Sequence, residues 1–282
     1  MTSIPPRTLG LISAFDKPAA QELAPQLIGW LEGRGCATVD ETELLDGRPV
    51  DAIVVLGGDG LMMHAAHAHP GIPLLGINFG TVGFLAMVER SRWEPALEAL
   101  LDGSFELQVG PTLAAEIVRE GRVIEAEWAI NDVVIRSGIR MVEVELYVDR
   151  QYVNTYPGDG MIVASPQGST AYCMAAGGPI LTAGVHGFAV TPLSPHSPIR
   201  ATLVLPEESL IELVVSNERE AHLILDGGEL RDLRHGDIVR VRKGVEQFRL
   251  IVVPGMSFYD AFRSKFNYLI RPNARPSLGY RR

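Results

Sequence analysis

The sequence predicts an α/β domain with a parallel sheet, followed by a β-rich domain. Up to residue 103, apolar strand patterns alternate with amphipathic helix patterns, as they do in consecutive βαβ units. From residue 104 onward, stretches in which every second residue is apolar follow one another and are separated by short turns. Such period-two stretches are typical of antiparallel strands with one buried face.

The N-terminal elements are predicted in order along the chain. A strand is expected at residues 8–14, buried strands at residues 52–56 and 72–77, and helices at residues 18–31, 61–68 and 93–101. In the first helix Leu23, Leu27 and Leu31 share one apolar face, because they recur once per turn. This alternation predicts that the strands lie side by side and parallel.

The β-rich region begins after the turn at Asp102-Gly103-Ser104. Within it we expect a strand over residues 128–135 and one short helix over residues 169–176, and a last helix follows at residues 259–266. The predicted domains are residues 1–103, residues 104–256, and a C-terminal helix and tail, residues 257–282, that returns to the N-terminal domain.

The composition indicates a soluble, globular protein. Of 282 residues, 46% are hydrophobic and 21% are charged, which is an ordinary balance for a folded domain. The net charge of −9 argues against a nucleic-acid-binding surface. No apolar run is long enough to span a membrane, and the first residues carry no signal-like segment. Cys36 and Cys173 form no Cys-x-x-Cys pair, so a reducing cytoplasm is expected.

Three common site motifs are missing. The three lysines, Lys17, Lys243 and Lys265, do not fall in a Gly-x-x-x-x-Gly-Lys-Ser/Thr phosphate loop. No Gly-x-Gly-x-x-Gly follows a predicted strand, and no Gly-x-Ser-x-Gly is present. These absences disfavour P-loop, Rossmann dinucleotide and α/β-hydrolase sites.

The run Gly57-Gly58-Asp59-Gly60 follows a predicted buried strand and precedes a helix of small residues. Glycines at such a turn let backbone N–H groups approach a phosphate, and the helix N-terminus adds partial positive charge. An acid repels phosphate, so Asp59 is expected to bind a cation or to take a proton from a hydroxyl. The alternative is an ordinary turn in which Asp59 caps the helix.

A second glycine-rich turn, residues 76–85 with Asn78, follows the next predicted strand. Ligands bind at the carboxyl ends of strands in open α/β sheets, so both turns are candidate binding loops. In the β-rich region, Asn131-Asp132 interrupts an apolar strand pattern and could hydrogen-bond the hydroxyls of a ribose. Farther along, hydroxyls and an aromatic ring suited to a nucleoside occur at Ser165, Ser169, Thr170 and Tyr172, although helix caps explain the hydroxyls equally simply.

Four blocks in this order make the chain resemble the NAD kinase family, the ATP-NAD kinases that make NADP. They are the Gly-Gly-Asp-Gly run, the second glycine-rich turn, Asn131-Asp132, and the stretch from Asp159-Gly160 to Gly177-Gly178-Pro179. Thr191-Pro192 and Asp226-Gly227 resemble further family blocks. The likeness covers residues 50–230, and Asp132 departs from it by standing where Glu is usual.

The resemblance implies an NAD kinase-like two-domain fold with the active site in the crevice between the domains. Asp59 is then expected to act as general base on the 2′-hydroxyl of the adenosine ribose of NAD. The phosphoryl donor is expected to be ATP or polyphosphate, with a divalent cation, Mg²⁺ or Mn²⁺. Family members form homodimers or homotetramers. The other positions expected to contact substrates are Gly57, Gly58, Gly60, His64, Asn78, Asn131, Asp132, Arg140, Asp159, Ser169, Thr170, Ala171, Tyr172 and Cys173.

Two alternative functions stay open at this point. The Gly-Gly-Asp-Gly run also occurs in diacylglycerol-type lipid kinases and phosphofructokinases, so a lipid or sugar kinase is one alternative. A non-catalytic NAD(P) sensor is the other. His64, His67 and His69 invite a metal site, but no acid or cysteine completes the set, so none is predicted.

Overall fold

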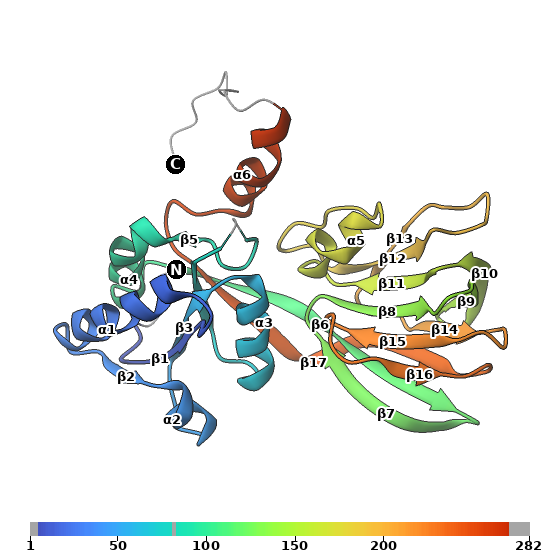
Figure 1. The fold of residues 1–282 in the computed structure, drawn as a ribbon, viewed down its shortest axis with the longest axis horizontal. Helices are drawn as coiled ribbons and strands as arrows, with labels where there is room; N and C mark the ends of the chain where they lie inside the picture. Colours follow the sequence, from blue (N-terminus) through green and yellow to red (C-terminus); the bar gives the residue numbers. More distant parts are fainter. Residues whose placement is uncertain (1–4, 81–82, 271–282) are drawn as a thin grey trace. The chain divides into compact units, whose positions relative to one another are not determined.

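The computed structural model describes residues 5–80 and 83–270, with side chains up to residue 265 (Figure 1). The chain divides into two compact units. Unit 1 runs to Val109 and resumes at Phe248, and unit 2 runs from Gly110 to Gln247. The sequence-based boundaries lie at 103/104 and 256/257. The difference arises because two strands, β6 (Glu106–Arg119) and β17 (Ile238–Val252), run from one unit into the other.

Unit 1 is built on a parallel sheet with the strand order β2-β1-β3-β4, extended by the end of β17. Its strands are β1 (Thr8–Ser13), β2 (Ala37–Val39), β3 (Ala52–Gly57), β4 (Leu74–Asn78) and the short β5 (Val88–Glu89). All six residues of β3 are buried, because helices cover both faces of the sheet. The predicted parallel sheet is confirmed.

Four helices of unit 1 lie on the two faces of this sheet (Figure 1). They are α1 (Pro18–Glu32), α2 (Glu41–Leu45), α3 (Asp59–Ala68) and α4 (Trp93–Leu101). The last helix, α6 (Phe258–Ile270), packs instead on the loop at Phe84. Leu27 of α1, Leu97 of α4 and Val54 of β3 share one buried cluster. On the opposite face, Leu44 of α2 occupies the space beside Gly10, where a Cβ would lie 2.9 Å from its methyl carbons.

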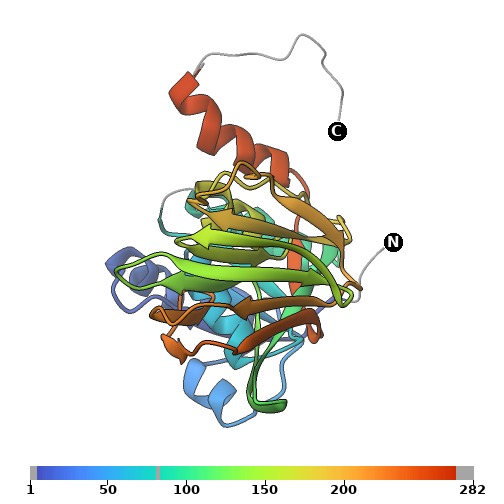
Figure 2. The same ribbon diagram turned by 90° about the vertical axis from the view of Figure 1, so that its right-hand side faces the viewer.

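Unit 2 contains two sheets that share one core (Figure 2). The first has the order β10-β9-β14-β17, with β6 and β7 paired beside it, and the second has the order β13-β12-β11-β8-β15-β16. The remaining strands are β7 (Arg122–Ala129), β8 (Asp132–Ser137), β9 (Val142–Val148), β10 (Gln151–Gly158), β11 (Gly160–Ala164), β12 (Gly187–Leu193), β13 (Leu203–Pro206), β14 (Ile211–Val215), β15 (Ala221–Leu225) and β16 (Arg231–Leu233). The predicted β-rich domain is confirmed.

The strands β8, β11 and β12 are buried on both faces. On the inner face, Val133, Met161 and Phe188 lie in the core between the sheets. On the outer face, Val134 and Ile162 belong to a second cluster with residues of the segment that contains α5 (Tyr172–Ala175). The long apolar runs in these strands therefore reflect burial on two sides, as in parallel sheets, although their pairing is antiparallel.

Two sequence-based expectations need correction. The strand expected over residues 128–135 is two strands, because β7 ends at Ala129 and β8 begins at Asp132. The helix expected over residues 169–176 is a 3₁₀ turn, Gly168–Thr170, followed by the short α5. The short elements β2 and α2 were not predicted. The last helix is confirmed as α6, whereas residues 271–282 lie outside the described residues.

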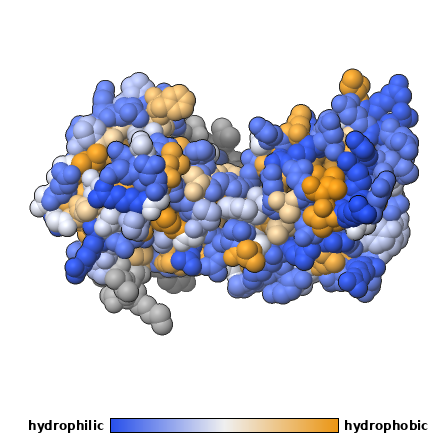
Figure 3. Space-filling view, turned by 90° about the horizontal axis from the view of Figure 1, so that it is seen from below, coloured by the Kyte–Doolittle hydropathy of each residue, from blue (hydrophilic) through white to orange (hydrophobic). Residues whose placement is uncertain are grey.

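The surface is mostly hydrophilic on the face in Figure 3, where apolar atoms form small separate groups. Among the residues described, no helix is both long enough and apolar enough to cross a membrane.

We predict that Phe188→Ala lowers the free energy of unfolding by about 3–5 kcal/mol, because it empties a fully buried position between the two sheets of unit 2. Urea denaturation would measure the loss. Phe15→Ala is the matched control, since Phe15 is 92% exposed and its truncation should change stability by less than about 0.5 kcal/mol. Equal effects of the two substitutions would contradict the prediction.

Candidate active site

Asp59 is the first residue of α3, and its side chain does not cap its own helix. The N-cap is Gly58, in an extended conformation, and no side chain caps the helix. The alternative interpretation of Asp59 as an ordinary helix cap is therefore wrong. The carboxylate lies instead against the turn that follows β4.

Three consecutive backbone N–H groups bind the Asp59 carboxylate. Phe84 donates to Oδ2 at 2.8 Å, while Leu85 and Ala86 donate to Oδ1 at 3.0 and 2.9 Å. Gly83 is required at this contact, because a Cβ there would lie 2.0 Å from Oδ1. Since each carboxylate oxygen can accept two hydrogen bonds, one acceptor site stays available on Oδ2. The carboxylate of Asp59 is thus held in place and can still accept one further hydrogen bond.

The glycine-rich turns after β3 and β4 are bound to each other. The N–H of Phe79 donates to the carbonyl of Gly57 at 2.8 Å, and the N–H of Gly80 donates to Oδ1 of Asn78 at 2.8 Å. These bonds place Gly57, Asn78 and the start of α3 at one edge of the sheet, as the sequence predicts. Residues 81 and 82 of the second turn lie outside the described residues.

The turn that holds Asp59 also packs against α6. The ring of Phe84 stacks on Phe258 with 5.5 Å between centroids, and Nζ of Lys265 lies 4.5 Å from the centre of the Phe84 ring. The C-terminal helix thereby supports the loop whose N–H groups bind Asp59. Farther along α3, the predicted contact residues Gly60 and His64 are exposed.

In unit 2, a second aspartate binds three consecutive backbone N–H groups. The carboxylate of Asp226 accepts from Ile130, Asn131 and Asp132 at 2.7, 2.7 and 3.0 Å. Asp226 has a φ of 50°, a left-handed conformation that aspartate tolerates better than most residues. The bend that carries Asn131-Asp132 is therefore shaped by a residue about 95 positions away.

Asp132 is buried, with 5% of its surface exposed. Burial, and then the nearby charge of Asp226, raise the pKa of Asp132 to about 7. The carboxyl can therefore donate or accept a hydrogen bond near neutral pH, which suits recognition of hydroxyls. Cys173 lies close enough that the charge of Asp132 adds to burial in raising the pKa of the thiol.

The hydroxyls after β11 are mostly bonded within the protein. Ser165 donates to the carbonyl of Ile130, and Ser169 donates to the carbonyl of Pro166 at 2.6 Å and accepts the N–H of Leu181 at 2.9 Å. Thr170 donates to the carbonyl of Gln167 at 3.1 Å. Ser165 and Ser169 thus shape the turn from inside, whereas the neighbouring Ala171 and Tyr172 are partly exposed and accessible to a ligand.

Two predicted contact residues of unit 2 are exposed. Asp159 lies between β10 and β11, flanked by Gly158 and Gly160. Gly160 has a φ of 135°, and a Cβ there would lie 1.9 Å from the carbonyl oxygen of Ile135, so the backbone at Asp159 is tightly fixed. Arg140 follows β8 in an exposed bend.

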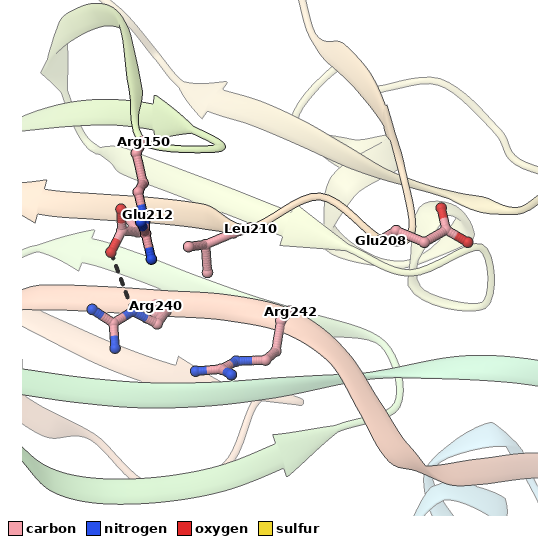
Figure 4. Close-up of a pocket in the computed structure, with 6 residues that line it drawn as sticks. All are labelled: Arg150, Glu208, Leu210, Glu212, Arg240 and Arg242. Carbon is pink, nitrogen blue, oxygen red and sulfur yellow. Dashed lines mark hydrogen bonds and ion pairs between the residues drawn. The ribbon is translucent and has the colours of Figure 1, made fainter.

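A hollow of about 370 Å³ in unit 2 contains none of the predicted site residues (Figure 4). It is lined by Arg150, Glu208, Leu210, Glu212, Arg240 and Arg242. Nε of Arg240 pairs with Glu212 at 3.1 Å, and Arg242 pairs with Glu116 at 2.9 Å. Because acids pair with Arg240 and Arg242, two of its three arginines, this hollow is a poor site for a phosphate-bearing ligand.

Comparison with known proteins decides the family. A model of the ATP-NAD kinase N-terminal domain matches residues 13–105, and a model of the ATP-NAD kinase C-terminal domain matches residues 130–253. The chain belongs to the ATP-NAD kinase family. The NAD kinase of Thermomicrobium roseum is 57% identical over 272 residues, which cover 96% of this chain and 95% of that protein. The NAD kinase of Heliobacterium modesticaldum is 38% identical over 276 residues, covering 92% and 98%.

Solved structures confirm the ATP-NAD kinase fold. Yeast NADH kinase complexed with NADH matches with a TM-score of 0.83 and 20% identity, over 98% of this chain and 91% of that one. An NAD kinase from Archaeoglobus fulgidus in complex with ATP matches with a TM-score of 0.74 and 23% identity, over 92% and 97%. The predicted family and the predicted combination of an α/β domain and a β-rich domain are both confirmed.

Two features of this ATP-NAD kinase site were not predicted from the sequence. One is the set of N–H groups at Phe84, Leu85 and Ala86, which no side-chain pattern reveals. The other is the role of Asp226, which the sequence presents as part of an Asp-Gly turn and of a family block, without the backbone groups that it binds. An acid before a glycine, at a position with positive φ, is a weak signal for a carboxylate that binds remote backbone.

We predict that Asp132→Asn becomes more stable relative to wild type as pH rises. The pKa of Asp132 is higher in the folded protein than in the unfolded chain, where it is near 4. Its contribution to stability is therefore fully present below the unfolded pKa and is lost as pH rises through about 7. Asparagine stays neutral, so the stability difference should change by about 1–2 kcal/mol between about pH 6 and about pH 8.5.

Urea denaturation at each pH would measure this difference. Glu229→Gln is the control, because it removes an exposed acid of the same unit and should show no such trend. A stability difference between Asp132→Asn and wild type that is constant over this range would show that Asp132 does not titrate there.

Proposed function

We propose that the chain transfers a phosphoryl group from ATP to the 2′-hydroxyl of the adenosine ribose of NAD, giving NADP, with Asp59 as the general base. The observation that carries this role is the hydrogen bonding of Asp59, in which three N–H groups fix the carboxylate and one acceptor site stays available on Oδ2. A ribose hydroxyl that donates to this site would have its proton accepted as the new O–P bond forms. Phosphoryl transfer depends chiefly on such alignment and on charge stabilisation.

The residues of unit 2 are proposed to bind NAD. Asp132, with a pKa of about 7, can exchange hydrogen bonds with ribose hydroxyls as donor or acceptor. The partly exposed ring of Tyr172 offers an aromatic face to a base. The exposed side chains of Asp159 and Arg140 are accessible to the polar parts of the dinucleotide. His64, exposed on α3, is proposed to contact a phosphate.

The donor is proposed to enter as a metal–nucleotide complex. Mg²⁺ or Mn²⁺ bound to the phosphates would spread their charge, and Asp59 is a carboxylate of the kind that supplements phosphate ligands. Inorganic polyphosphate is the alternative donor. The family resemblance further suggests a homodimer or homotetramer, which light scattering would measure. A reducing cytoplasm suits Cys36 and Cys173, which are both buried and unpaired with each other.

The proposed function predicts NADP formation from NAD, ATP and Mg²⁺, and a loss of roughly 10²-fold or more in kcat for Asp59→Asn. The amide cannot accept the hydroxyl proton. KM values for NAD and ATP should change much less than kcat. Asp46→Asn, which removes an exposed acid at the end of α2, is the matched control and should leave kcat unchanged.

Thermal unfolding of both variants separates chemistry from folding. A folded Asp59→Asn enzyme with near-normal kcat would remove Asp59 from the mechanism. If wild type makes no NADP from ATP or polyphosphate, the proposed function is wrong. Turnover of diacylglycerol or a fructose phosphate would then favour a lipid or sugar kinase, and saturable NADP binding without turnover would favour a sensor.

A further inference from the structure

Lys17 has a different environment from the other two lysines of the chain. Lys243 pairs with Glu207, and Lys265 lies over the ring of Phe84. Among the side chains of residues 5–80 and 83–265, no carboxylate forms an ion pair with Lys17, although its side chain is only partly exposed. The ammonium group therefore lies on unit 1 without a direct carboxylate partner among those residues.

The fold directs Lys17 to the carboxyl edge of the parallel sheet. Lys17 ends the turn between β1 and α1, where its N–H donates to the carbonyl of Ala14 at 3.3 Å. The N–H of Ala14 in turn donates to the carbonyl of Leu56, at the end of β3, at 3.0 Å. This turn is therefore bonded directly to the strand that precedes the Gly-Gly-Asp-Gly run.

The ammonium group of Lys17 lies beside both glycine-rich turns. A Cβ built on Gly58 would be 3.8 Å from Nζ, and a Cβ built on Gly80 would be 3.2 Å from it. A Cβ at Gly80 would crowd the ammonium group, whereas one at Gly58 would be in ordinary van der Waals contact with it. Because both are glycines, the ammonium group and the backbone of two separate turns border the same space.

Two sources of positive potential meet at this place, namely the ammonium group of Lys17 and the N-terminus of α3, which follows Gly58. The N–H of Gly80 is already bonded to Asn78, so the turn at Gly80 allows close approach and adds no charge. A single small anion needs only one of the two sources, whereas a chain of phosphates can reach both. Lysine is a common point-charge ligand for phosphate.

We propose that Lys17 binds the phosphate chain of a substrate at the Gly58 and Gly80 turns and is a specificity-determining residue for the phosphoryl donor. This inference rests on the proposed function, which supplies two phosphate chains, the triphosphate of ATP and the pyrophosphate of NAD. The triphosphate carries the greater charge, so Lys17 should contribute more to binding ATP. Charge stabilisation by Lys17 also replaces part of what a P-loop lysine provides in other kinases.

The test compares Lys17→Met, which keeps length but not charge, with Lys17→Arg, which keeps charge. Arg34→Met is the matched control, since it removes one exposed positive charge just after α1. Binding of inorganic tripolyphosphate, measured by calorimetry, should weaken roughly 10- to 100-fold in Lys17→Met, be partly restored in Lys17→Arg, and stay unchanged in Arg34→Met. Equal tripolyphosphate binding by wild type and Lys17→Met overturns the inference.

Steady-state kinetics then identify which substrate provides the phosphates. A rise in KM for ATP with little change in KM for NAD assigns Lys17 to the donor, and a rise in KM for NAD alone assigns it to the pyrophosphate and overturns the donor role. The binding measurement needs no turnover. A wild type that binds tripolyphosphate through Lys17 but makes no NADP would therefore refute the proposed function and leave the phosphate site intact.

Discussion

The N-terminal unit depends on the hydrogen bonds between the carboxylate of Asp59 and three successive backbone N–H groups. Asp59 comes from the first turn of α3, and Phe84, Leu85 and Ala86 come from the chain after β4. Without the carboxylate, these partly buried N–H groups would lack a charged acceptor, and the turn would lose its attachment to the helix. Gly83 has no side chain, which leaves room for this carboxylate. Asp59, the acid expected to act as the general base, therefore also holds the loop after β4 in place.

In the second unit, too, an aspartate carboxylate binds three successive backbone N–H groups. Asp226 binds the N–H groups of three successive residues and thereby presents Asp132. Asp132 is buried, and the nearby charge of Asp226 adds to burial in raising the pKa of Asp132, which favours its neutral form. The two carboxyl groups at this bend therefore have different roles. Asp226 binds the backbone, and Asp132 can hold a proton near neutral pH. Such division by environment is how proteins obtain distinct roles from one residue type.

Much of the fold was predictable because its signals are local. The buried runs of β3 and β4 and the amphipathic faces of α1 and α4 are visible within a few residues, and so are the glycines that end the strands. The two-residue β5 and the five-residue α2 are too short to give a period. The bend at Asn131 was read as part of a strand, because the residue that shapes it lies about 95 positions away. Contacts such as those of Ser165 and Ser169, whose hydroxyls bond inside the turn, depend on tertiary structure and leave no local signal.

Strands β6 and β17 each begin in one unit and end in the other, and this connectivity affects folding during synthesis on the ribosome. Unit 2 is continuous in sequence, whereas unit 1 is interrupted and receives its last sheet strand and α6 only from the C-terminal part of the chain. Ile251 and Val253 belong to the same buried cluster as Leu27 and Leu97. The N-terminal unit therefore cannot complete its core when it emerges, and the later-made unit is the first whose whole chain is present. Nascent chains of this protein thus leave the start of β4 without its β17 partner until the end of β17 has been made.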